Sequence, residues 1–154
     1  KTIQLQSIGQ IEDAVQKIHN ADKIYIFGRG FSEMIAKEMT IKLQLIGKTC
    51  EVHDDPNIIR LKSREIEKSE LAIFVSLNGE TAELVEACQN LSMKQVTTIT
   101  VTTRIDSTLS KISDMTLVGY KGEQSFFPDY EVRSRLSLHV IARILLDAYV
   151  IRMK

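Results

Sequence analysis

Apolar residues follow two different spacings along this chain, and the two alternate from one end to the other. Ile8, Ile11, Val15 and Ile18 recur at helical spacing and predict an amphipathic helix near 7–20. Short apolar or β-branched runs predict buried strands at 23–28, 49–53, 71–75, 96–102 and 115–118. Further helices are predicted at about 31–47, from Pro56 onward, at about 80–93, from Ser107 onward and at about 132–153.

Strands that alternate with helices are typical of a parallel sheet whose right-handed crossovers place helices on both faces. Five such strands predict an α/β, flavodoxin-like, doubly wound sheet with the order 2-1-3-4-5. In that order the winding reverses between strands one and three, and ligands bind at this switch point, beyond the carboxyl ends of the strands. With 154 residues and no internal linker, the chain is expected to form a single domain over 1–154.

The last predicted helix carries more apolar positions than it needs to pack against one sheet. A stripe about 100° wide is enough for that purpose. The surplus, together with Met34, Ile41 and Leu45 on the helix at 31–47, favours a subunit interface and hence a homodimer or a higher homo-oligomer. The alternative is a helix sandwiched between other elements of the same chain.

Gly47 is well placed as the C-terminal glycine that ends the helix at 31–47.

Composition and charge narrow the function classes. Twenty basic and twenty acidic residues cancel, so the chain lacks the basic surface of a protein that holds nucleic acid by itself. No apolar run approaches the ~18 residues of a membrane span. Cys50 and Cys88 match no zinc spacing, and they are expected to be reduced, buried thiols of a cytoplasmic protein. We expect no metal and no cofactor.

A polar turn between the strand at 71–75 and the following helix is the first candidate for chemistry. It reads Ser76-Leu77-Asn78-Gly79-Glu80-Thr81. A helix N-terminus offers unpaired N–H groups and a partial positive charge, so the turn favours an anion such as a phosphate ester. The hydroxyl, amide and glycine residues Ser76, Asn78, Gly79 and Thr81 are the predicted contacts. The alternative is a simple capping turn, in which Glu80 and Glu83 complement the helix dipole.

A second turn of this kind follows the strand at 23–28 and reads Gly28-Arg29-Gly30-Phe31-Ser32. Gly30 and Ser32 are predicted to contact the same phosphate, unless Ser32 only caps its helix. Arg29 either neutralises phosphate charge or lies on the surface. The turn is not a dinucleotide fingerprint, because Glu33 stands where the third glycine would be.

Two further residues are candidates for contact with the organic part of a ligand. His53 ends the second predicted strand near the same edge of the sheet, although a lone histidine is more often simply solvated. Glu131 precedes the last helix and could act as a general base or bind sugar hydroxyls. The alternative for Glu131 is an acidic residue that only stabilises the helix N-terminus.

Several segments, taken in order, resemble the sugar isomerase (SIS) domain over roughly Ile8 to Tyr149. They are Gly28–Ser32 with Ala36-Lys37, Lys42–Lys48, Ser76–Thr81 and Ile99-Thr100. Lys42–Lys48 and Arg133-Ser134-Arg135 look most like the C-terminal sensing half of RpiR-type bacterial transcription regulators. The resemblance implies that Ser32, Ser76 and Thr81 bind the phosphate of a phosphosugar. Asn78 replaces a serine of the family pattern and can still donate through its amide.

The resemblance implies a phosphosugar-binding sensor domain of an RpiR-type regulator. Because the chain starts at Lys1 and contains no helix-turn-helix segment, we expect a fragment whose DNA contacts belong to an absent N-terminal domain. The alternative function is a phosphosugar aldose–ketose isomerase. Isomerase members of the family use a glutamate near the start of the last helix as base, and Glu131 is the candidate for that role.

Overall fold

The computed structural model describes residues 8–119 and 135–153. Five strands are formed by Ile24–Gly28 (β1), Cys50–His53 (β2), Leu71–Val75 (β3), Thr97–Thr102 (β4) and Met115–Val118 (β5). The helices are Ile8–Asn20 (α2), Ser32–Leu45 (α3), Pro56–Glu65 (α4), Ala82–Met93 (α5), Thr108–Ile112 (α6) and Leu136–Met153 (α7). Each of these elements overlaps one predicted from the sequence.

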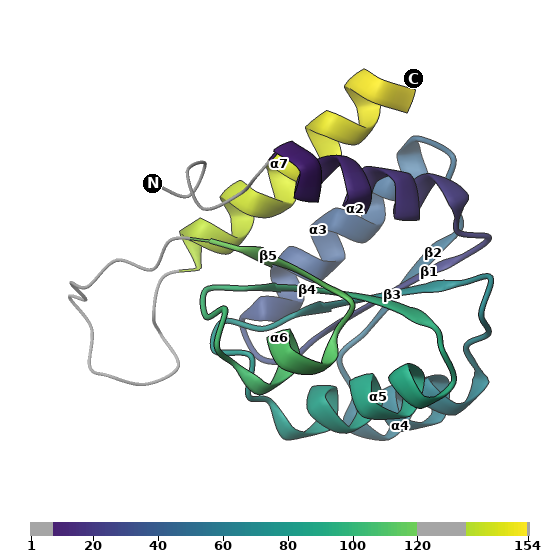
Figure 1. Cartoon of the computed structure of the whole chain (residues 1–154), viewed down its shortest axis with the longest axis vertical. Helices are drawn as coiled ribbons and strands as arrows, with labels where there is room; N and C mark the ends of the chain where they lie inside the picture. Colours follow the sequence, from purple (N-terminus) through teal and green to yellow (C-terminus); the bar gives the residue numbers. More distant parts are fainter. Residues whose placement is uncertain (1–7, 120–134, 154) are drawn as a thin grey trace.

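The sheet has the order β2-β1-β3-β4-β5 and all its described pairs are parallel, which confirms the predicted doubly wound topology. The helices α2, α3 and α7 cover one face, and α4, α5 and α6 cover the other (Figure 1). The chain reverses its winding between β1 and β3, which are neighbours in the sheet. The carboxyl ends of these two strands therefore form the switch point at which the two polar turns meet.

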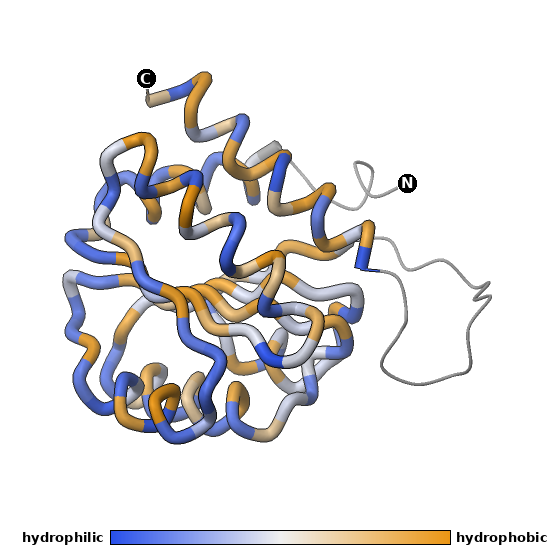
Figure 2. The backbone as a smooth tube through the Cα atoms, turned by 180° about the vertical axis from the view of Figure 1, so that it is seen from behind, coloured by the Kyte–Doolittle hydropathy of each residue, from blue (hydrophilic) through white to orange (hydrophobic). Residues whose placement is uncertain are grey.

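The buried side chains form two hydrophobic cores, one on each face of the sheet, because successive side chains of a strand point to opposite faces. Ile24 and Ile26 of β1 belong to the core under α2, α3 and α7, whereas Tyr25 and Phe27 belong to the core under α4 and α5. Every residue of β1 and β3 is buried, as expected for central strands of a parallel sheet. In Figure 2 the strands at the centre of the molecule are accordingly coloured mostly as hydrophobic.

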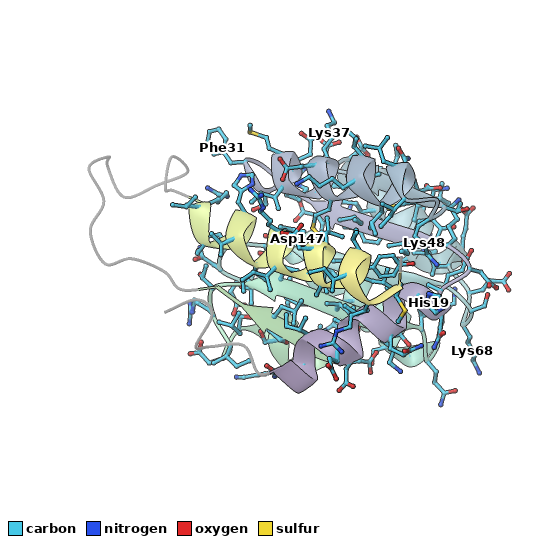
Figure 3. All side chains as sticks on the ribbon, turned by 90° about the horizontal axis from the view of Figure 1, so that it is seen from above. His19, Phe31, Lys37, Lys48, Lys68 and Asp147 are labelled. Carbon is cyan, nitrogen blue, oxygen red and sulfur yellow. The ribbon has the colours of Figure 1, made fainter. Side chains whose placement is uncertain are left out.

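Helix α7 lies between α2 and α3 on one face of the sheet (Figure 3). Its buried residues are Leu138, Ile141, Ala142, Leu145, Leu146 and Tyr149. The wide apolar surface of α7 is therefore mostly used inside the chain, as the sandwiched-helix alternative expected. Its exposed apolar side chains, Leu136, Val150 and Ile151, lie near its two ends.

The two cysteines lie in different cores on opposite faces of the sheet and are not joined. Burial raises the pKa of the Cys50 thiol to about 11 and the pKa of the Cys88 thiol to about 12. Both are therefore protonated, inert core residues near neutral pH. No helix in the described part of the chain combines the length and the apolar character needed to cross a bilayer.

Candidate functional site

A cleft of about 510 Å³ opens beyond the carboxyl ends of β1 and β3. This volume falls in the range of small-molecule sites. Its lining residues come from the two polar turns, from the first turn of α5 and from the residue that precedes α7. They are Arg29, Gly30, Ser32, Ser76, Leu77, Asn78, Glu80, Thr81, Glu83 and Arg135. The topology thus brings together the two turns that the sequence singled out.

Ser32 is the first residue of α3 and its side chain is almost fully buried, with 2% of the residue exposed. It does not cap the helix, because the cap position is Phe31 and no side chain bonds to the helix N-terminus there. Gly30 makes the preceding turn possible with a φ of +58°, a value that favours glycine. The hydroxyl of Ser32 is therefore available to the cleft rather than used as a cap.

The second turn arranges two hydroxyl groups side by side. Ser76 Oγ lies 3.2 Å from Thr81 Oγ1 and accepts a hydrogen bond from the Gly79 backbone N–H at 3.0 Å. Thr81 occupies the cap position of α5, yet its side chain makes no capping bond. Gly79 does not line the cleft, and its N–H stabilises the turn through the bond to Ser76 Oγ. No side-chain cap is thus formed in this turn, although Glu83 does lie in the first turn of α5, as the capping alternative expected.

Backbone N–H groups add to these hydroxyl donors. In the ranges 8–119 and 135–153, no group of the protein accepts a hydrogen bond from the N–H of Asn78, Glu80, Thr81, Ala82 or Glu83. Unpaired N–H groups at a helix N-terminus carry a partial positive charge and attract anions. The turn after β3 therefore presents hydroxyl and amide donors to the cleft that Asn78 and Thr81 line.

Arg29 connects the loops after β1 and β2 with the first turn of α5. Its Nη1 donates to the backbone oxygen of Asp54 at 2.8 Å, and its Nε lies 3.4 Å from Glu83 Oε1. The Nε is buried, and within the described residues the carboxylate is not aligned to accept a hydrogen bond from it. Arg29 thus lines the cleft while it holds the loops after β1 and β2 against the first turn of α5.

Arg135 is a cleft residue that the sequence did not indicate as a ligand contact. Its Nε donates to Ser32 Oγ at 3.1 Å, and its guanidinium lies 5.5 Å from the centre of the Phe31 ring. The residue belongs to the Arg133-Ser134-Arg135 stretch that carried part of the resemblance. That stretch gave a signal for the family, but only the packed fold brings the start of α7 to the cleft.

Of the two remaining candidates from the sequence, the structure describes only His53. His53 does not line the cleft: its Nε2 contacts Glu51 Oε2, and its ring packs 6.3 Å from the centre of the Phe27 ring. His53 can reach the Glu51 carboxylate because the two residues are two positions apart on β2, and alternate residues of a strand share one face. Glu131 lies outside the described residues.

The chemistry of the described cleft is that of binding a negatively charged group. Its two described carboxylates are already held, Glu83 near Arg29 and Glu80 by Thr108. Hydroxyl groups and amide N–H groups face the cleft, and Arg135 also lines it. Among the described residues, no group of three or more histidine, cysteine, aspartate or glutamate side chains is arranged to hold a metal ion.

The sequence matches the family model of the SIS domain over residues 17–136. Among curated proteins, it is 27% identical over 144 residues to an uncharacterized HTH-type transcriptional regulator of Caldanaerobacter subterraneus. That alignment covers 94% of this chain and 51% of the relative, so the chain spans about half the length of that regulator.

Solved structures share the fold. The sugar isomerase domain of an RpiR transcription factor from Sphaerobacter thermophilus superposes with a TM-score of 0.88 at 23% identity, over 98% of this chain and 82% of that one. The Vibrio vulnificus NanR protein complexed with ManNAc-6P superposes with a TM-score of 0.90 at 20% identity, over 99% of this chain and 57% of that one.

Proposed function

Since this chain belongs to the SIS domain family, we propose that it binds a phosphorylated sugar in the cleft between the turns after β1 and β3. The observation that carries the proposal is the convergence of Ser32, Ser76 and Thr81 with Arg135 and a row of unpaired N–H groups. A phosphate dianion can accept hydrogen bonds from all of these donors.

The phosphate would sit at the N-terminus of α5. Ser76, Thr81 and the N–H groups of the turn would bind its oxygens from one side, with Ser32, Gly30 and Arg135 on the other. Asn78 is exposed at the mouth of the cleft, where its amide can donate to the phosphate or to the sugar. The volume beyond the phosphate leaves room for a sugar of ordinary size.

We further propose that this binding serves to sense the phosphosugar in a transcription regulator. The relative from Caldanaerobacter is an HTH-type regulator, and NanR, a neighbour in fold, was solved with ManNAc-6P. DNA would be held by a helix-turn-helix domain outside this chain, in the cytoplasm. The ligand would act on DNA binding only if it has different affinities for two arrangements of the regulator.

Binding rather than turnover is the activity that the described cleft supports. Isomerisation requires a general base within reach of the sugar carbons. Glu83 and Glu80 are engaged by Arg29 and Thr108, as described above. The binding proposal therefore expects no aldose–ketose conversion when the protein is incubated with sugar phosphates and the mixture is followed by NMR. Conversion that Glu131→Gln abolishes would establish the isomerase instead.

Self-association belongs to the same proposal. Met34, Ile41 and Leu45 on α3 are 62%, 52% and 80% exposed, and Phe31, which precedes the helix, is 45% exposed. Figure 3 shows Phe31 and Lys37 projecting from the outer side of this helix. Sedimentation should give a dimer or a larger species, and a monomer at micromolar concentration would contradict this part of the proposal.

A thermal shift series tests the binding proposal. ManNAc-6P and other sugar phosphates are compared with the same sugars without phosphate. A ligand at 100 times its dissociation constant stabilises the folded state by about 2.7 kcal/mol. We expect stabilisation by phosphorylated sugars only.

The variant Ser76→Ala/Thr81→Ala links the shift to the cleft. Each lost hydrogen bond to a charged group should cost about 1.5–3 kcal/mol of binding free energy. Ser92→Ala, an exposed serine near the far end of α5, is the matched control and should bind like the parent. Unchanged affinity in the double variant would refute the site.

A further inference from the structure

The turn 76–81, which would bind phosphate, is held by hydrogen bonds from the segment 102–109. The backbone oxygen of Leu77 accepts hydrogen bonds from Thr103 N at 3.1 Å, from Thr103 Oγ1 at 2.7 Å and from Thr102 Oγ1 at 3.1 Å. The backbone oxygen of Gly79 accepts from Leu109 N at 3.0 Å. The carbonyl groups of Leu77 and Gly79, which are two residues apart in the turn, are thus both fixed by the same segment.

Because peptide bonds are planar, fixing these two carbonyl groups also fixes the direction of the N–H groups that follow them. In a trans peptide the C=O and the following N–H point in opposite directions. When the Leu77 oxygen points toward segment 102–109, the Asn78 N–H points away from it. The same relation holds between the Gly79 oxygen and the Glu80 N–H. These are two of the N–H groups that lack an acceptor in the described structure and whose residues line the cleft.

The fit between the turn and this segment leaves no spare room at Gly79. Its φ is +70°, and a Cβ built on it would lie 2.1 Å from Ser107 Oγ. Ser107 is fully buried and caps the short helix α6 by accepting from Ser110 N at 3.3 Å. The contact therefore requires both the glycine and the cap serine in their present positions.

Glu80 completes the connection. Its Oε1 accepts a hydrogen bond from Thr108 Oγ1 at 2.6 Å and its Oε2 accepts from Thr108 N at 2.9 Å. Bonds from the Thr108 hydroxyl and N–H lower the pKa of the Glu80 carboxyl, so this side chain is ionised at neutral pH. A free carboxylate on a phosphate-binding turn would repel the ligand, but this one is directed to α6.

We propose that Glu80 and Thr108 are a positioning pair, which locks the turn 76–81 onto segment 102–109 so that the N–H groups of Asn78 and Glu80 stay aimed at the phosphate. The inference rests on the proposed function, because it concerns the same phosphate. Thr108 touches no ligand in this arrangement. Its effect on affinity comes only through the conformation of the turn.

The test is a titration of the ¹⁵N-labelled protein with inorganic phosphate, followed by NMR. In the parent protein, the amide resonances of Asn78 and Glu80 should shift with a common dissociation constant. Thr108→Val removes the hydroxyl donor at nearly constant shape and should weaken phosphate binding about tenfold, the loss expected for one strong hydrogen bond. Thr108→Ser keeps the hydroxyl and should restore the parent affinity.

Glu80→Gln provides a second variant at an exposed position, should Thr108→Val fold poorly. It should weaken binding similarly, and the double variant should lose no more than either single variant, because the two residues act as a unit. Thr116→Val, on β5, is the control for loss of a threonine hydroxyl and should bind like the parent. All variants are compared at equal thermal stability or at a temperature well below unfolding.

The outcomes separate the two proposals. If Ser76→Ala/Thr81→Ala abolishes phosphate binding while Thr108→Val and Glu80→Gln leave it unchanged, the positioning pair is overturned and the proposed function stands. If phosphate moves no resonance of the turn in the parent, the proposed function itself fails. Weakened binding in Thr108→Val with full recovery in Thr108→Ser supports the pair.

Discussion

Arg135 Nε donates a hydrogen bond to Ser32 Oγ at 3.1 Å and so joins two residues that are 103 positions apart in the chain. Ser32 opens α3 and Arg135 immediately precedes α7, so the bond ties the starts of two helices together at one wall of the cleft. The same guanidinium lies over the Phe31 ring. A cation held by a hydroxyl and an aromatic ring is pre-organised to meet an anion.

Arg135→Gln is expected to weaken the binding of the sugar phosphate that stabilises the parent protein most, by about 1.5–3 kcal/mol, the cost of losing a hydrogen bond to a charged group. Arg135→Lys should lie between the parent and Arg135→Gln, because lysine keeps the charge but not the planar guanidinium. Isothermal titration calorimetry measures both. Arg143→Gln, which removes an exposed arginine of α7 paired with Asp147, is the control. Parent-like affinity in Arg135→Gln would exclude the guanidinium from phosphate binding.

Gly79→Ala is expected to destabilise the fold by more than about 2 kcal/mol, because it combines an unfavourable positive φ with a clash against Ser107. Gly47→Ala is the matched control: its φ is +94°, but a Cβ there meets open space. It should cost only about 1 kcal/mol. Urea unfolding measures both. Equal costs for the two variants would show that the contact with Ser107 contributes nothing.

The fold could be predicted from the sequence because its determinants are local. The strands Leu71–Val75 and Met115–Val118 have the predicted bounds, since continuous apolar or β-branched runs ended by turn residues leave little choice. The C-terminal glycine of α3 was predicted and is confirmed: Gly47 has a positive φ, and Lys48 N bonds back to Leu43 O at 3.0 Å.

The details of the site depend on contacts between distant residues, which periodicity does not contain. Arg135 reaches Ser32 only because α7 packs beside α3. His53 was a candidate for a ligand contact, but Glu51 on the same face of β2 holds its imidazole. The sequence also allows Ser32 as a helix cap, and that alternative is wrong because Phe31 holds the cap position and the helix begins at Ser32 itself.

Gln95→Gly is expected to stabilise the protein by about 1 kcal/mol. Gln95 follows the C-cap of α5, Lys94, and has a φ of +61°, in the left-handed conformation that glycine adopts without strain. The bonds around it match those around Gly47: Gln95 N bonds to Ser92 O and Val96 N to Leu91 O, both at 3.0 Å. Gln95→Ala, which keeps the strain, should leave the free energy of unfolding nearly unchanged. A loss of stability in Gln95→Gly would contradict the strain argument.

Glu51 is expected to make stability depend on pH in the acid range. Burial alone would raise the pKa of its carboxyl, but hydrogen bonds from Lys23 and His53, with the charge of Lys62, outweigh burial and lower the pKa to about 2. The folded state therefore binds a proton less readily than the unfolded state, whose carboxyl has a pKa near 4.5. This contribution to stability is complete above about pH 4.5 and is lost as the pH falls toward 2.

Glu51→Gln tests this contribution with little change in shape. At pH 7 the variant should be less stable by on the order of 2 kcal/mol, since Lys23, His53 and Lys62 lose the carboxylate that they contact. As the pH falls from 4.5 to 2, the parent should lose this advantage and the two unfolding curves should converge. Glu86→Gln, which breaks an exposed pair with Arg60, should cost about 0–1 kcal/mol. A stability difference between Glu51→Gln and the parent that stays constant from pH 7 to pH 2 would show that the Glu51 carboxylate does not titrate in this way.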